Sequence, residues 1–183
     1  MKQLVVATLL LMFLTTGPAV TRSESVSQSI EKCLDQLHQN GELGALFTGF
    51  ILNREANFGK WQTDYLLFRH RGQQDWGGSQ ISLLFNDVTT LRPADYFDDP
   101  AHEFDSRYSV GDVVVFSECE VSNFSITLDG IGKLIGPVSF SGTFNPDAMR
   151  AAVAKDGVDG VLSGTLTAQG RSEWTTWSYW IGD

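Results

Sequence analysis

The spacing of apolar residues changes from a helical to a strand-like period near Gly41. In residues 24–41, apolar side chains recur along one face of a 3.6-residue period. These side chains are Val26, Ile30, Cys33, Leu34 and Leu37. The pair Asn40-Gly41 is a typical helix stop. The pattern predicts an N-terminal helix with Cys33 on its apolar stripe.

Short runs rich in β-branched and aromatic residues follow this helix, separated by Gly, Asn, Asp or Pro. The eight runs are 44–53, 60–70, 80–91, 112–121, 124–130, 133–144, 160–169 and 173–182. Several of them alternate apolar with polar residues, as Phe124, Ile126 and Leu128 do with the residues between them. Repeated short strands of this kind predict an antiparallel β-barrel or a β-sandwich.

One further helix is predicted within residues 145–157. Asn145 suits the N-cap, Pro146 suits the first turn and Gly157 can end the helix. The fold class is therefore mainly β (α+β), with about eight strands, an N-terminal helix and one helix before the final hairpin.

The first residues have the order of a secretory signal peptide. A charged residue precedes the apolar run 4–14, and small residues follow. This run is shorter than the roughly 20 apolar residues of a membrane span. We predict a cleaved signal peptide over residues 1–23, a single globular β-rich domain over residues 24–183, and a secreted or periplasmic protein without a membrane span.

The remaining chain is strongly acidic. Residues 24–183 keep 11 of the 13 basic residues and all 22 acidic ones, which gives a net charge of −11. Such a surface repels phosphate backbones, so a nucleic acid is not expected as a partner. A basic protein partner or a cation suits this charge better, although acidity also serves solubility alone.

Cysteine usage agrees with export. Cys33 and Cys119 are the two cysteines of the chain, and two cysteines in an exported protein predict one disulfide. Asn123 begins the sequon Asn-Phe-Ser, which matters only in a host that glycosylates secreted proteins.

Residues 93–105 form a predicted acidic loop. The EF-hand spacing fails there, because Phe97 and Pro100 fall where a ligand and a glycine are needed. Zinc would need more His or Cys ligands than the loop contains. An irregular calcium site could still form from Asp98, Asp99, Glu103 and Asp105. The alternatives are catalytic carboxylates of a hydrolase and a solvated loop without further function; no other cofactor is predicted.

Large aromatic residues occupy both faces of the last predicted strand, within residues 173–182. One face can join the core while the other is covered by a helix, lines a ligand pocket or meets a partner. The candidate ligand-binding residues are Trp61, Tyr65, Trp174, Trp177 and Trp180.

The tripeptide Gly59-Lys60-Trp61 resembles the G-x-W motif at the first barrel strand of the lipocalins. The resemblance implies a barrel with an apolar interior. It covers three residues, and the long N-terminal helix departs from the pattern of that family.

The sequence predicts a secreted or periplasmic, non-enzymatic binding protein. Its ligand would be a small apolar molecule or a protein partner. Two alternatives stay open: a small secreted hydrolase using carboxylates of the 93–105 loop, and an inhibitor or immunity-type protein that binds a basic partner.

Overall fold

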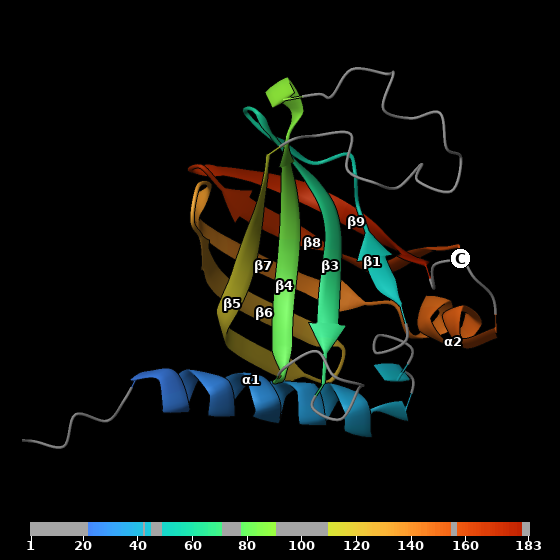
Figure 1. Cartoon of the computed structure of the whole chain (residues 1–183). Coiled ribbons are helices and arrows are strands. Elements are labelled where there is room, and N and C mark those ends of the chain that lie inside the picture. The colour runs from blue at the N-terminus through green and yellow to red at the C-terminus, as the bar shows by residue number, and fades with distance from the viewer. Residues whose placement is uncertain are drawn as a thin grey trace, which may run out of the picture.

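A closed antiparallel β-barrel forms the body of the protein. The computed structural model describes residues 22–41, 43–44, 49–70, 78–90, 110–154 and 157–180. Eight strands form the ring in the order β1-β9-β8-β7-β6-β5-β4-β3, and β1 closes it by pairing with β3. From β3 to β9, each ring strand pairs with the next one along the chain (Figure 1).

The strands match the runs predicted from the sequence. They are β1 (Phe50–Leu52), β3 (Trp61–Arg69), β4 (Gln80–Asp87), β5 (Gly111–Ser122), β6 (Ser125–Gly132), β7 (Gly136–Phe144), β8 (Val158–Ala168) and β9 (Arg171–Trp180). The short β2 (Asn57–Phe58) pairs with β3 beside the ring, and a 3-10 turn (Val88–Thr90) follows β4. The prediction of a mainly β fold is confirmed, and the structure is a barrel rather than a sandwich.

Large aromatic side chains fill the inside of the barrel. Alternation along each strand turns one set of side chains inward, and β6 shows this regularly from Ile126 to Gly132. The largest of the fully buried side chains are Trp177, Tyr179, Phe58, Phe68, Phe85, Phe116, Phe140 and Phe144. Phe140 and Trp177 meet edge to face, with ring centroids 6.1 Å apart. The interior is therefore a packed core, as is usual for eight-stranded barrels filled by their own side chains.

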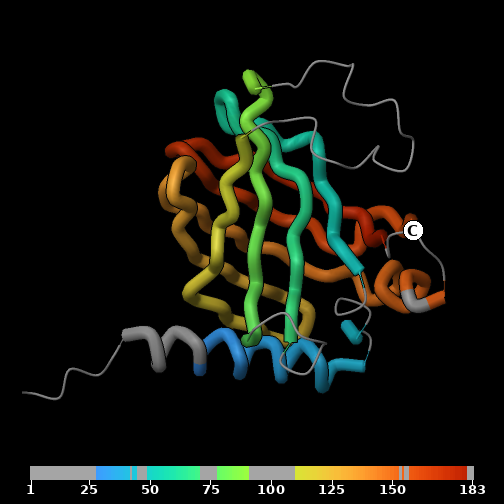
Figure 2. Tube along the Cα trace, viewed as in Figure 1, coloured from blue at the N-terminus to red at the C-terminus, as the bar shows by residue number. Residues whose placement is uncertain are grey.

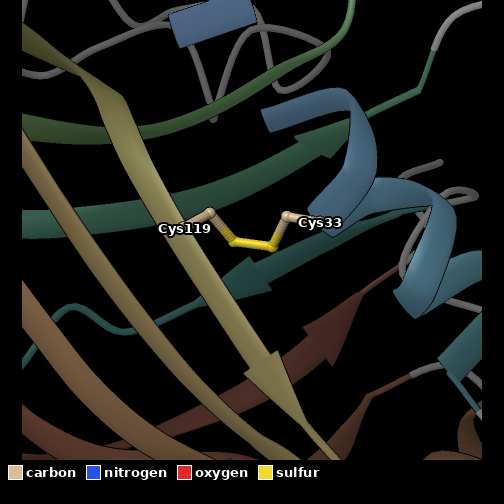
Figure 3. The surroundings of a disulfide bond; sticks show 2 residues. All are labelled: Cys33 and Cys119. Atoms are coloured by element: carbon tan, nitrogen blue, oxygen red, sulfur yellow. A yellow bond between two sulfur atoms is a disulfide. The ribbon is translucent and has the colours of Figure 1, made fainter. Parts of the chain in front are cut away.

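Helix α1 (Arg22–Gln39) lies across one end of the barrel (Figure 1). The tube in Figure 2 shows β3, β4 and β5 side by side, reaching the helix at that end. Ile30, Leu34 and Leu37 are buried on its apolar face. The predicted disulfide joins Cys33 of the helix to Cys119 of β5, with Cα atoms 5.9 Å apart (Figure 3). One covalent bond thus holds the helix to the barrel wall.

Helix α2 (Pro146–Ala154) packs against β8 and precedes the final hairpin, as predicted. Asn145 is its N-cap, because its Oδ1 accepts hydrogen bonds from the backbone N–H groups of Asp147 and Ala148. The side chains of Met149 and Ala152 are buried, which gives the helix a small apolar face.

A buried carboxylate organises the turn between β6 and β7. Asp112 of β5 is 5% exposed and accepts hydrogen bonds from the backbone N–H groups of Lys133, Leu134 and Ile135, at 3.2, 2.7 and 2.8 Å. Removing this carboxylate would leave the three backbone N–H groups without their hydrogen-bond acceptor, which costs free energy of folding.

Asp112→Ala should therefore lower the free energy of unfolding by about 2 kcal/mol. Urea unfolding followed by tryptophan fluorescence measures the loss. The matched control is Glu120→Ala, an exposed acid on the same strand, which should change the free energy by less than about 0.5 kcal/mol. Equal losses in the two variants would show that Asp112 does not hold the turn.

None of the helices in the described part of the chain combines the length and the hydropathy that a membrane span requires. The predicted signal peptide lies almost entirely outside the described residues, as does the whole 93–105 loop. Helix α1 begins at Arg22, next to the predicted end of that peptide.

Candidate functional site

A groove of about 570 Å³ crosses the outer wall of the barrel over β5, β6, β7 and β8. It is lined by Ser117, Glu118, Asp129, Gly130, Ile131, Ile135, Pro137, Val138, Ser139, Thr167, Ala168, Gln169 and Gly170. Its volume lies in the range of ordinary ligand sites.

A β-bulge and small residues shape this groove. The pairing of β5 with β6 shifts between Phe116 and Glu118, so that Ser117 is the extra residue. Gly130 permits the close approach of the two strands, because a Cβ atom there would lie 2.7 Å from the carbonyl oxygen of Val115. Ser117 donates a hydrogen bond from Oγ to the carbonyl oxygen of Asp129, at 3.4 Å. The groove thus depends on an irregularity that reshapes the wall locally.

Two acids face each other at the rim of the groove. Glu118 of β5 and Asp129 of β6 are directly opposite in the antiparallel register, and both are exposed. Like charges in this position destabilise a sheet. The pair therefore concentrates negative charge at the rim of the groove.

An exposed apolar strip adjoins the acidic pair. Ile131 lies two residues beyond Asp129 on the same outer face of β6 and is 70% exposed. It is paired with Val115 of β5, which is 47% exposed, and Val113 continues the strip along that strand. Acidic and apolar side chains therefore lie next to each other on one wall.

Comparison with family models, with curated proteins and with solved structures found no match. Any function of the groove is therefore inferred from its own geometry and charge.

The five aromatic residues predicted to bind a ligand are spread over several environments. Trp61 and Trp177 belong to the packed core, with exposed fractions of 4% and 0%. Tyr65 and Trp180 are partly exposed and both contact Phe50, with ring centroids 5.1 and 6.0 Å from it. Trp174 points outward from β9 and is 72% exposed. The structure thus joins Tyr65 and Trp180 through Phe50 but does not gather the five into one pocket.

The surroundings of Tyr65 and Trp61 show structural roles. Burial, and then the negative charge of Asp64, raise the pKa of Tyr65 above its usual value. The Nζ atom of Lys60 lies 4.8 Å from the ring centroid of Trp61. Gly59 turns the chain into β3 with a φ of 69°. The barrel implied by the resemblance to the G-x-W motif is present, and Trp61 is one of its core residues.

Among the described residues, the buried carboxylates, Asp87 and Asp112, are both held by structural hydrogen bonds. Lys60 donates to Asp87 Oδ2 at 2.5 Å, and Thr89 donates to Asp87 Oδ1 through its backbone N–H and its hydroxyl. The hydrogen bond from Lys60, followed by those from Thr89, holds the pKa of Asp87 below its usual value. Both acids serve to fix turns at the ends of strands.

In the part of the chain that the structure describes, no group of three or more His, Cys, Asp or Glu is arranged to hold a metal ion. The four calcium candidates, Asp98, Asp99, Glu103 and Asp105, lie outside the described residues. The same holds for the carboxylates of the hydrolase alternative, so both stay predictions.

Glu118, Asp129 and Ile131 were not expected as site residues from the sequence. Strand alternation does place Asp129 on the polar face of its strand. The opposition of Glu118 to Asp129, however, depends on the bulge in β5, which strand alternation does not reveal. The apolar Ile131 is one signal that the sequence does contain, because it breaks the polar pattern on the outer face of β6.

Proposed function

We propose that the protein is a secreted, non-enzymatic binding protein that holds a basic protein partner against the outer wall of its barrel. The groove would take an extended segment of the partner that presents basic and apolar side chains in turn. The observation that carries this proposal is the like-charged pair Glu118 and Asp129 beside the exposed Ile131. Wall charges of this kind accelerate association with a cationic partner as well as selecting it.

Two further observations support an outer site over an inner one. The inward-facing positions are filled by large, fully buried aromatic side chains. A small apolar ligand inside the barrel would have to displace a packed core, which costs several kcal/mol. The Cys33–Cys119 disulfide suits an oxidising compartment and supports the proposed export.

A synthetic peptide that repeats Lys-Ser-Leu-Ser is a suitable probe. In an extended chain, residues i and i+2 lie on one face about 6.7 Å apart, so this peptide presents lysine and leucine alternately to the wall. Asp129 and Ile131 have the same i, i+2 relation on β6. The probe should bind in calorimetry, and its affinity should fall as salt is added.

The double substitution Glu118→Gln and Asp129→Asn should weaken binding of this peptide about tenfold. The same change should leave the free energy of unfolding unchanged or raise it by about 0.5 kcal/mol, because it relieves the repulsion between the acids. Glu120→Gln, an exposed acid of β5 outside the groove lining, serves as the matched control. Binding that survives the double substitution, or no binding of the peptide at all, would refute the proposed function.

A further inference from the structure

A face made almost entirely of hydroxyl side chains covers the outer wall from β6 to β9. The strand registers align these side chains in three rows, each of which crosses all four strands. Of the twelve positions, ten are Ser or Thr. They are Ser125, Thr143, Ser163 and Thr176 in one row, Thr127, Ser141 and Thr165 in the next, and Ser139, Thr167 and Ser172 in the last. The other two positions are Trp174 and Asp129.

The spacing of this hydroxyl face follows from sheet geometry. Neighbouring strands lie about 4.8 Å apart, and outward positions along one strand lie about 6.7 Å apart. Thr167 and Ser172 show the closeness directly, because their hydroxyl oxygens are 2.8 Å apart in neighbouring strands. The wall therefore offers a regular grid of groups that both donate and accept hydrogen bonds.

Trp174 is the one aromatic residue of the hydroxyl face and is 72% exposed. Thr165 lies directly opposite it, and Ser172 and Thr176 flank it on the outer face of β9. A large indole in this position leaves apolar area in water, which favours a ligand that covers it. Its neighbours in the grid have hydroxyl side chains. We therefore expect the ligand to have an apolar centre with polar groups around it.

We infer that the hydroxyl face binds a neutral polysaccharide, with one pyranose ring stacked on Trp174 and its hydroxyl groups bonded to the surrounding Ser and Thr side chains. A pyranose ring has apolar C–H faces and a polar rim, which matches an indole among hydroxyls. An anionic polysaccharide is disfavoured, because the grid contains no Lys or Arg and the chain has a formal charge of −9. An apolar protein surface is disfavoured as a partner as well, because Trp174 is the only large apolar side chain of the grid.

This inference goes beyond the proposed function and does not depend on it. The two surfaces share Asp129, Ser139 and Thr167, but Trp174 lies on β9 outside the groove lining and Glu118 lies on β5 outside the hydroxyl face. Glu118→Gln, which changes a residue outside the hydroxyl face, should leave polysaccharide binding unchanged, and Trp174→Ala should leave binding of the lysine-leucine peptide unchanged. The two proposals can therefore fail separately.

Affinity gel electrophoresis of the full chain tests the inference. The gels contain hydroxyethyl cellulose, laminarin or galactomannan as neutral polymers and alginate as the anionic one. At least one neutral polymer should retard the protein, alginate should not, and Trp174→Ala should weaken the retardation about tenfold or more. Trp174→Tyr, which keeps a flat ring, should retain part of the binding.

Leu134→Ala is the matched control, because it removes an exposed apolar side chain (53% exposed) from the turn outside the hydroxyl face. It should leave the retardation unchanged. Thermal unfolding of the variants verifies that the barrel is intact, since an exposed side chain contributes little to folding. No retardation by any of the three neutral polymers, or full retardation of Trp174→Ala, would overturn the inference.

Discussion

Replacing Cys33 and Cys119 together with serine should lower the free energy of unfolding by about 4 kcal/mol. The disulfide closes a loop with a sequence separation of 86 residues, so its loss greatly increases the freedom of the unfolded chain. It is also the one covalent link between α1 and the barrel wall in the described structure. Guanidinium unfolding of the two proteins, followed by circular dichroism, measures the difference.

Helix α1 should stay in place when the two cysteines are replaced with serine. The buried Ile30, Leu34 and Leu37 hold the helix by packing, so the serine variant should still fold with the helix in place. Adding a reductant to the wild type should reproduce the loss in stability, and the serine variant should not respond to it. A loss below about 1 kcal/mol would show that packing alone holds the end of the barrel.

Trp177→Ala should lower the free energy of unfolding by about 4 kcal/mol, because it removes the largest buried side chain from the barrel interior. The indole contacts Phe140 edge to face, and its Nε1 donates a hydrogen bond to Thr175 Oγ1 at 2.8 Å. Thr175 in turn donates to the carbonyl oxygen of Gly164. The substitution therefore creates a cavity and removes one link of a buried hydrogen-bond chain.

Trp174→Ala provides the matched comparison for this experiment. Trp174 lies on the same strand but points outward, so its loss should change stability by less than about 0.5 kcal/mol. Thermal and urea unfolding of both variants gives the two values. Similar losses at the two positions would contradict the assignment of Trp177 to a packed core and of Trp174 to the surface.

The elements of the fold could largely be predicted from local patterns. The eight apolar runs became the ring strands, and Asn145 and Pro146 marked the start of α2 correctly. The disulfide followed from cysteine count and compartment. The choice between barrel and sandwich could not be made, because it depends on the pairing of β1 with β3. This pairing is a long-range contact of a strand of only three residues, from Phe50 to Leu52. Nothing local in the sequence indicates that this strand pairs with β3.

The candidate sites were less predictable than the fold. Alternation along the last strand places Trp174 and Trp177 on opposite faces, but it does not say which face is the inner one. Of the five aromatic candidates, Trp61 and Trp177 pack in the core, whereas Tyr65, Trp174 and Trp180 are partly or largely exposed. The opposition of Glu118 to Asp129 and the rows of hydroxyls both arise from strand registers. Registers of this kind are fixed by turns and bulges together, and a single sequence does not reveal them.

The proposed function places the partner on the outer wall of the barrel and not inside it. Two-dimensional proton–nitrogen NMR of the full chain, titrated with the Lys-Ser-Leu-Ser peptide, tests this most directly. We expect saturable amide shifts centred on Ser117, Glu118 and residues 129–131, with the indole N–H of Trp177 unmoved. Shifts centred on the aromatic core residues, or no saturable shifts along β5 and β6, would contradict it.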